Sequence, residues 1–208
     1  MLSYERKAKK HGFQTIVGID EAGRGPLAGP VVACAVLLKS YDFESIIRDS
    51  KKMTPKQRQI AYREIREKAY VGTGLSDAKL IDHINILKAT FHAMTLATED
   101  LFFKLPKAKV SKNQLQKQTC LFVDGNAFET HLPFKYQTIV QGDSLSLSIA
   151  CASIAAKVTR DHMMENYDNA FPGYEFKTHK GYPTALHKEK IKELGLSPIH
   201  RKTFKYWK

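Results

Sequence analysis

The sequence contains no long apolar run and few cysteines. No apolar stretch approaches the ~20 residues that a membrane-spanning helix needs, and the opening residues, MLSYERKAKK, lack the apolar segment of a signal peptide. The three cysteines, Cys34, Cys120 and Cys151, lie in apolar surroundings and include no C-x-x-C pair, which disfavours both a disulfide framework and a zinc site. These absences predict a cytoplasmic protein with reduced, buried cysteines and no membrane partner.

Acidic residues are scarce relative to basic ones. The chain of 208 residues has 33 Lys and Arg against 21 Asp and Glu, a formal net charge of +12, and its isoelectric point is near 9.5. The basic residues are clustered, because 104–117 contains five lysines and no acid, and 173–208 contains nine basic residues against three acidic ones. A generally basic surface would explain the net charge, but the clustering favours a polyanionic partner, nucleic acid.

The stretch VGIDEAGRGPLAGPVV, residues 17–32, contains a partial match to a dinucleotide-binding fingerprint. Residues 23–28, GRGPLA, satisfy G-x-G-x-x-A and follow a strand-like run. In a dinucleotide site, however, the glycines open a helix that receives a phosphate, with no carboxylate in front. Here Asp20 and Glu21 come first, and the apolar run Val31–Leu38 follows. The pattern therefore indicates a strand, a tight turn and a second strand.

The rest of the chain alternates between strand-like and helix-like segments, which predicts an α/β protein. The expected main layer structure covers residues 1–172, and 173–208 form a small basic helical segment that contacts the substrate. We expect strands at Thr15–Ile19, Val31–Leu38, Val71–Leu75, Thr119–Val123 and Tyr136–Val140, and helices at Thr54–Lys68, from the N-cap Ser76 to Phe103, from Ser144 onward, and at Thr184–Leu194.

Acidic residues stand at the ends of three predicted strands: Asp20 with Glu21, then Asp124, then Asp143. Ligands bind at strand ends in an α/β sheet, so these carboxylates can converge although they are far apart in sequence. Such a cluster needs cations, and its oxygen donors suit Mg²⁺ or Mn²⁺. The alternative is that each acid only begins a turn, as Asp-Gly commonly does.

Several long motifs, in order along nearly the whole chain, resemble ribonuclease HII of the bacterial type. They are GIDEAGRGPLAGPVV, DSKKM, IDHINILKAT, LFVDGN, QGDSLSLSIACASIAAKVTRD, HKGYPT and SPIHRKTF. The resemblance implies a ribonuclease H-like fold, with a mixed five-stranded sheet flanked by helices. It also implies hydrolysis of RNA strands paired to DNA, and cutting 5′ of single ribonucleotides embedded in duplex DNA.

Residue by residue, the resemblance implies four metal-binding, catalytic carboxylates at Asp20, Glu21, Asp124 and Asp143. Two Mg²⁺ or Mn²⁺ ions held there would activate a water and stabilise the leaving oxygen, giving 3′-hydroxyl and 5′-phosphate ends. Substrate contacts are implied at Gly23, Arg24, Gly25 and Tyr182. The glycines would let backbone groups approach a sugar closely, or they only form the turn.

Four further residues are candidate substrate contacts. Lys51 and Lys52 would bind phosphate, or form a solvated lysine pair. Ser153 and Lys157 are four residues apart on a predicted helix, although helix packing is the rival role for Ser153. Asp161 is expected to pair with a nearby Arg or Lys.

Other functions remain open at this point. A basic nucleic-acid-binding module would bind duplexes without turnover, and a junction resolvase would cut branched DNA that lacks ribose. A mechanism with a 2′-hydroxyl nucleophile would use histidines, but His179, His187 and His200 lie in a basic segment where phosphate contact or packing serves as well. A monomer is expected, because no heptad or apolar patch is evident.

Overall fold

The computed structural model describes residues 1–106 and 111–204. Tyr206 and Trp207, which the sequence predicts as packing residues, lie outside this part of the chain. All three cysteines are free and buried, as predicted. Within the described ranges, no helix is both long and apolar enough to cross a membrane.

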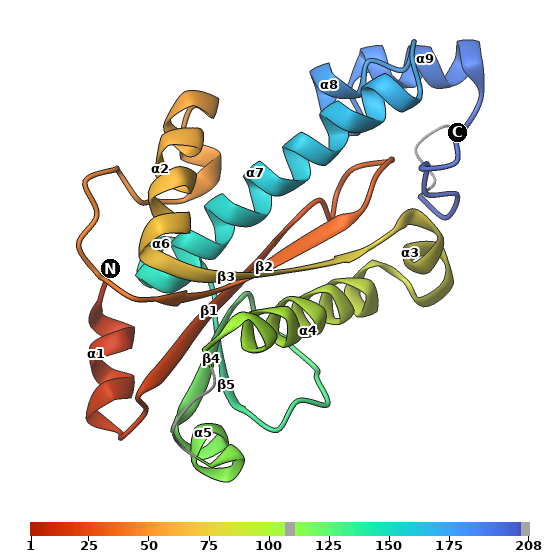
Figure 1. Cartoon of the computed structure of the whole chain (residues 1–208). Coiled ribbons are helices and arrows are strands. Elements are labelled where there is room, and N and C mark those ends of the chain that lie inside the picture. Colours follow the sequence, from red (N-terminus) through yellow and green to blue (C-terminus); the bar gives the residue numbers. More distant parts are fainter. Residues whose placement is uncertain (107–110, 205–208) are drawn as a thin grey trace.

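A mixed five-stranded sheet forms the centre of the molecule (Figure 1). Its strands are β1 (Thr15–Ala22), β2 (Val31–Leu38), β3 (Ala69–Ser76), β4 (Thr119–Asp124) and β5 (Lys135–Ile139), in the order β3-β2-β1-β4-β5. β2 is antiparallel to β1 and β3, whereas β4 is parallel to β1 and β5. β1, β4 and β5 therefore end at one edge of the sheet. The predicted α/β class and mixed sheet are confirmed.

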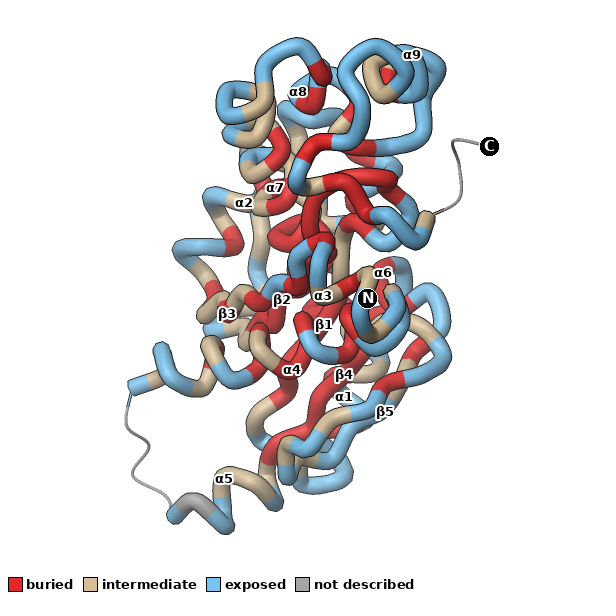
Figure 2. The backbone as a smooth tube through the Cα atoms, turned by 90° about the vertical axis from the view of Figure 1, so that its right-hand side faces the viewer, coloured by how far each residue is buried: buried red, intermediate tan, exposed pale blue. Residues whose placement is uncertain are grey.

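Two long helices cover the two faces of this sheet, α4 (Ile86–Lys104) on one side and α7 (Leu147–Ala170) on the other (Figure 1). Successive side chains of a strand point to opposite faces. Val17 and Ile19 of β1 join the core formed with α4, while Gly18 between them lies against α7. Burial of both faces explains why the central strands are nearly continuous apolar runs (Figure 2).

The close contact between β1 and α7 depends on Gly18. A Cβ atom built there would lie 2.1 Å from the backbone carbon of Ser148, so any side chain would push the first turn of α7 away from the strand. The serines and alanines at this end of α7 have the small side chains that such close packing needs. This contact fixes the start of α7 two residues from Asp20 along β1.

The remaining helices surround this core. They are α1 (Ser3–Lys10), the 3₁₀ helix η1 (Ser50–Lys52), α2 (Pro55–Lys68), α3 (Ala78–Ile84), α5 (Lys112–Gln118), α6 (Gly142–Leu145), α8 (Phe176–His179) and α9 (Ala185–Leu194). The predicted start of α2 is confirmed, because Thr54 and Gln57 form a reciprocal capping box. α1 and α5 were not predicted from the sequence.

The single helix predicted from Ser76 to Phe103 is wrong. Ser76 is the last residue of β3, and Asp77 caps α3 by accepting a hydrogen bond from the Leu80 N–H. At Asn85 the chain turns with φ 70°, and the Asn85 side chain caps α4. Asparagine tolerates this left-handed conformation better than most residues. The apolar spacing continues across the break, so periodicity alone could not reveal it.

The tight turn predicted between the first two strands is also wrong. Residues 23–30 form a longer connection between β1 and β2 that pairs with the C-terminal segment. Ala28 and His200 form an isolated antiparallel bridge. The Leu27 N–H donates to the Gly181 carbonyl at 2.8 Å. The connection is therefore a packed element rather than a hairpin tip.

Candidate active site

Asp20 and Asp124 lie at the edge where β1 and β4 end. The last paired residues of these parallel strands are Ile19 and Val123, so an aspartate follows on each strand. Neighbouring strands are about 4.8 Å apart, which brings the two residues close together. Glu21 follows directly, and its N–H donates to Asp20 Oδ1 at 2.7 Å. Three of the predicted carboxylates thus share one edge.

Asp143 reaches the same edge through α6, the short helix after β5. Ile139 of β5 pairs with Asp124 of β4. The Gly142 N–H then donates to Asp124 Oδ1 at 2.7 Å, which ties the start of α6 to the end of β4. The Asp143 side chain accepts a hydrogen bond from Ser144 Oγ at 3.4 Å. The structure therefore gathers all four predicted carboxylates.

Burial and mutual repulsion disfavour the charged forms of these acids. The pKa of Asp20 is raised well above its usual value, first by burial and then by the charges of Glu21 and Asp124. The pKa of Glu21 is raised by burial and by Asp124, although Arg24 opposes the rise. Arg24 Nη1 lies 3.4 Å from Glu21 Oε1. The charged forms of these acids are therefore only partly compensated by neighbouring protein cations.

Asp49 is a further acid at this edge that sequence reasoning missed. It accepts the Lys51 N–H at 2.9 Å and so caps η1. The pKa of Asp143 is raised by burial and then by Asp49 and Asp124. Burial alone would lower the pKa of Lys51, but the charges of Asp20, Asp143 and Asp49 raise it. Lys51 thus stays protonated beside the carboxylates.

The chemistry of these residues fits a divalent cation. Every ionisable donor of the set Asp20, Glu21, Asp124 and Asp143 is a carboxylate, the hard oxygen ligand that Mg²⁺ and Mn²⁺ prefer. Bound positive charge would also relieve the repulsion that raises their pKa values. Among the described residues, no group of three or more His, Cys, Asp or Glu side chains is arranged so that it could hold a metal ion as it stands.

A pocket of about 440 Å³ opens beside this acidic edge. It combines acidic, basic and hydroxyl side chains from β1, β4, η1, α7 and the loop before α9. The lining residues are Glu21, Ala22, Gly23, Arg24, Gly25, Ser50, Lys51, Asp124, Ser153, Lys157 and Tyr182. Most of the predicted substrate contacts therefore face one space. Lys52 does not line it and pairs at 3.8 Å with Asp49.

In the Gly-Arg-Gly segment, the fold requires a glycine at the first position but not at the second. Gly23 has φ +100°, and a Cβ there would lie 2.1 Å from Arg160 Nε, so the fold itself demands glycine at this position. Gly25 has no left-handed φ, and a Cβ there would meet nothing within 4 Å. Packing and backbone geometry therefore do not explain Gly25, which leaves one wall of the pocket open.

Two fully buried arginines hold the connection 23–30 in place, and sequence reasoning missed both. Arg201 donates hydrogen bonds of 2.6–3.0 Å to the carbonyl oxygens of Gly23, Arg24 and Gly29. Arg160 donates hydrogen bonds of 2.9–3.1 Å to the carbonyl oxygens of Pro30, Lys180 and Ala28. Arg201 comes from the C-terminal segment and Arg160 from α7. The pocket wall is thus fixed by two distant parts of the chain.

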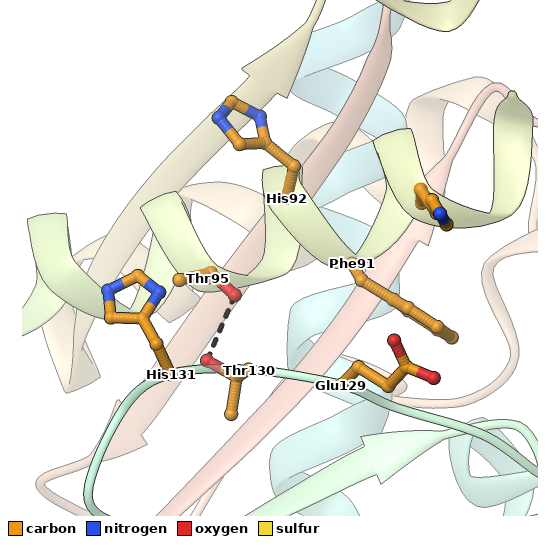
Figure 3. A pocket seen from close by; sticks show the side chains of 7 residues that line it. Phe91, His92, Thr95, Glu129, Thr130 and His131 are labelled. Carbon is orange, nitrogen blue, oxygen red and sulfur yellow. Dashed lines mark hydrogen bonds between the residues drawn. The ribbon is translucent and has the colours of Figure 1, made fainter. Parts of the chain in front are cut away.

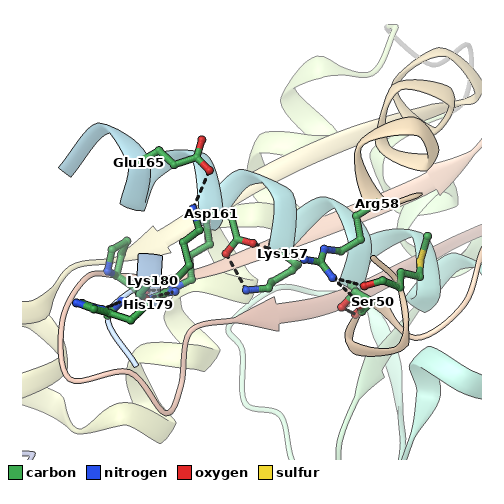
Figure 4. A network of polar contacts seen from close by, with 12 residues as sticks. Ser50, Arg58, Lys157, Asp161, Glu165, His179 and Lys180 are labelled. Carbon is green, nitrogen blue, oxygen red and sulfur yellow. Dashed lines mark hydrogen bonds and ion pairs between the residues drawn. The ribbon is translucent and has the colours of Figure 1, made fainter. Parts of the chain in front are cut away.

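A polar network along α7 positions the predicted contacts Ser153 and Lys157 (Figure 4). Ser153 Oγ lies 2.9 Å from Ser50 Oγ. Lys157 Nζ donates to Asp161 Oδ1 at 2.7 Å, and Asp161 also lies 4.0 Å from Arg58. Asp161 therefore pairs with Lys and Arg, as expected. Arg58 in turn donates to the Ser50 carbonyl at 2.9 Å, so η1 and α7 are connected.

Tyr182 also lines the pocket, from the loop between α8 and α9. Its side chain keeps 38% of its surface exposed. Lys157 Nζ and the Arg160 guanidinium each lie 5.7 Å from the centre of its ring. Two cations this close to the ring favour a fixed ring position, while the exposed part of the residue remains open to a ligand.

A second hollow, of about 410 Å³, lies between α4 and the segment after β4 (Figure 3). It is lined by Lys88, Phe91, His92, Thr95, Glu129, Thr130 and His131. None of the predicted site residues is among them. The hydroxyls of Thr95 and Thr130 lie 3.0 Å apart and tie the two walls together. The acidic edge, not this hollow, is the candidate active site.

Solved structures with the same arrangement define the class of the fold. A ribonuclease HII of Archaeoglobus fulgidus, solved in a complex with PCNA, matches with a TM-score of 0.69 at 20% identity, over 92% of this chain and 95% of that chain. A ribonuclease HIII solved in complex with Mn²⁺ matches with a TM-score of 0.69 at 17% identity, over 96% of this chain and 70% of that chain. The fold is that of the ribonucleases HII and HIII, which confirms the predicted ribonuclease H-like fold.

Sequence comparison gives the family. The ribonuclease HII family model matches residues 17–207. Ribonuclease HII of Geobacter sulfurreducens is 48% identical over 97% of this chain and 87% of its own length. That of Ruminiclostridium cellulolyticum is 48% identical over 98% of this chain and 75% of its own length. The chain belongs to the ribonuclease HII family, whose members are divalent-metal-dependent nucleases that hydrolyse RNA in RNA/DNA hybrids.

Proposed function

We propose that this chain is an endoribonuclease with two kinds of substrate. It hydrolyses the RNA strand of RNA/DNA hybrids, and it cuts 5′ of single ribonucleotides embedded in duplex DNA, leaving 3′-hydroxyl and 5′-phosphate ends. The observation that carries this proposal is the pocket in which Glu21 and Asp124 face Tyr182 and the open wall at Gly25. Such a space would offer carboxylate ligands for cations and, at Gly25, room for a sugar to approach the backbone.

Asp20, Glu21, Asp124 and Asp143 would hold two divalent ions, Mg²⁺ or Mn²⁺. When bound, such ions supply an activated water and stabilise the leaving oxygen of the phosphodiester. The crowding of buried carboxylates supports this assignment, because their repulsion is relieved only by added positive charge. Protein cations alone do not meet that need, since Arg24 only partly opposes the rise in the pKa of Glu21.

The remaining contacts would bind and orient the substrate strand. Lys51, which stays protonated beside the acids, would meet a phosphate. Lys157, oriented by Asp161, and the Ser153 hydroxyl would follow the backbone along α7. Lys52, more exposed and outside the pocket, would contact phosphate further along the duplex.

Gly23, Arg24 and Gly25 would form the sugar-recognition wall. Because no side chain covers Gly25, backbone groups of this segment can approach a ribose edge, and the 2′-hydroxyl is the group that distinguishes RNA from DNA. Arg201 and Arg160 fix the backbone of this wall and do not themselves line the pocket.

The wider organisation follows the same proposal. Residues 1–172 would form the catalytic part, and the basic segment 173–208 would add the wall that carries Tyr182 and contact the duplex. We propose that the protein acts as a monomer in the cytoplasm, on RNA/DNA hybrids and on ribonucleotide-containing duplex DNA.

An end-labelled substrate panel tests this function. The duplexes carry no ribonucleotide, one ribonucleotide, or a complete RNA strand, and each is incubated with Mg²⁺, with Mn²⁺, or with chelator. We expect cleavage of the last two duplexes only, only with metal, and with a 3′-hydroxyl upstream of the ribonucleotide. Binding without cleavage would instead identify a nucleic-acid-binding module, and cutting of branched DNA without ribose would identify a resolvase.

Tyr182→Ala is expected to lower kcat/KM about tenfold or more on a duplex with one embedded ribonucleotide, and clearly less on a continuous hybrid. The ring can lie close to a deoxyribose that follows the ribonucleotide, whereas a ribose would present an extra polar group there. Tyr182→Phe keeps the ring and should be intermediate. The measurement is kcat/KM on both substrates beside a melting curve. An equal loss on both, with a lower melting temperature, would reduce Tyr182 to a packing residue.

A further inference from the structure

Three histidines form a compact group beneath Tyr182. His179, His187 and His200 are exposed by only 6%, 0% and 2%. The rings of His179 and His187 are stacked, with centroids 4.0 Å apart and an interplanar angle of 17°. The Nε2 atoms of His187 and His200 lie 3.0 Å apart. Phe176 packs on all three rings, so the group is closed to solvent on that side.

The hydrogen bonds fix the tautomer of His187 and His200. His200 Nδ1 accepts the Ser197 N–H at 2.9 Å, so its proton is on Nε2. That proton is donated to His187 Nε2. The proton of His187 is therefore on Nδ1, which donates to the Tyr182 carbonyl at 2.9 Å. A directed chain thus runs from Ser197 through two neutral imidazoles to the backbone of Tyr182.

The third histidine holds the neighbouring peptide in the same way. His179 Nδ1 accepts the Gly181 N–H at 3.0 Å, and its Nε2–H donates to the Tyr174 carbonyl at 2.7 Å. The backbone beside His179 is in a left-handed conformation, with φ 51° at Lys180 and φ +81° at Gly181. A non-glycine residue in this region costs free energy and persists only where its surroundings impose it.

We propose that His179, His187 and His200 are positioning residues, which through neutral, directed hydrogen bonds hold Tyr182 where it selects an RNA-to-DNA junction. This inference rests on the proposed role of Tyr182. No histidine of the group lines the pocket, so the three act through the backbone at 181–182 and not on the substrate. The sequence left packing, phosphate contact and acid–base chemistry open for these histidines, and their burial away from the pocket disfavours the last two.

Burial keeps the three imidazoles neutral. Burial and the neighbouring histidines lower the pKa of His187 to about 4, and burial lowers that of His200 to about 4. The pKa of His179 is also lowered by burial, although Asp168 of α7 and Glu175 before α8 oppose this. Each accepting bond above therefore persists at neutral pH.

Imidazole ¹⁵N chemical shifts test the hydrogen-bond chain without any activity measurement. At pH 7 we expect His187 to be protonated on Nδ1 and both His179 and His200 on Nε2, with His187 and His200 titrating near pH 4. A charged imidazole at pH 7, or the opposite tautomer of His187, would overturn the chain. His131, an exposed imidazole whose Nε2 lies 3.2 Å from Glu99 Oε1, gives the reference spectrum of a histidine outside the group.

Two substitutions of His187 test its effect on selectivity, defined as kcat/KM on one embedded ribonucleotide divided by kcat/KM on a continuous hybrid. His187→Leu keeps bulk and loses the donor, and we expect selectivity to fall about tenfold. His187→Asn places an amide N–H near the position of Nδ1, and we expect it to restore selectivity to within about threefold. His131→Asn is the matched control and should leave selectivity unchanged. Equal selectivity in all variants would overturn the proposal.

A double-mutant cycle separates this proposal from the proposed function. In the Tyr182→Ala background, His187→Leu should have no further effect on selectivity, because nothing remains to be positioned. Independent, multiplying effects would overturn the positioning role while leaving the role of Tyr182 intact. If Tyr182→Ala alone left selectivity unchanged, the junction-sensing part of the proposed function would fail, and the inference with it.

Discussion

Asp124→Asn is expected to lower the rate of cleavage about 10²–10³-fold or more while leaving affinity for an RNA/DNA hybrid within about twofold. The substitution removes one negative charge from the ligand set and keeps the shape of the side chain. An asparagine Oδ1 can still accept the Gly142 N–H that now binds Asp124 at 2.7 Å, so the junction of β4 with α6 should stay intact. The loss should therefore be one of chemistry and not of folding.

The measurement is single-turnover cleavage at saturating Mg²⁺, beside hybrid affinity and the heat of Mn²⁺ binding to the free protein. Asp100→Asn is the matched control, because Asp100 also accepts a backbone N–H, that of Thr73, and does not line the pocket. Asp20→Asn should behave as Asp124→Asn does, and Asp143→Asn should recover partly in Mn²⁺, which tolerates looser coordination than Mg²⁺. Near-normal cleavage by Asp124→Asn would contradict the metal-ligand assignment.

The sheet and its acidic edge could be predicted because they depend on local patterns. Apolar runs such as Val31–Leu38 indicate buried strands whatever their partners, and an acid at the end of a strand is visible in the sequence. Convergence of Asp20, Asp124 and Asp143 then follows from the parallel order of β1, β4 and β5. Asp49 was missed because it follows an irregular segment, where no strand end marks it.

The elements that failed prediction depend on contacts between distant residues. Arginine is rarely buried, so nothing in the sequence indicated that Arg160 and Arg201 would lie inside and bind backbone carbonyls. The connection 23–30 was predicted as a tight turn because the residue that binds its carbonyls, Arg201, lies almost 180 residues further along the chain. The sequence also does not show that a side chain would clash at Gly23 and not at Gly25, because this depends on the neighbouring atoms.

Arg201→Met is expected to lower the free energy of unfolding by about 3 kcal/mol, because three buried carbonyls lose their donor at roughly 1–3 kcal/mol each, partly offset by removal of a buried charge. Met keeps most of the aliphatic volume. For a chain of this length the corresponding fall in melting temperature is about 6–12 °C. Arg66→Met, at an exposed arginine, is the control and should change stability by less than about 0.5 kcal/mol.

Arg201→Lys distinguishes the shape of the guanidinium from its charge. The fork of Arg201 reaches the carbonyls of Gly23, Arg24 and Gly29 at once, and a single ammonium cannot reproduce that geometry. Lysine would also leave its charge buried without matched partners, so we expect Arg201→Lys to be at least as unstable as Arg201→Met. Denaturant unfolding of both variants measures this. Full stability of Arg201→Lys would show that charge alone holds the connection 23–30, and the fixed sugar-recognition wall would then have to be explained by Arg160 and the backbone bridge at Ala28.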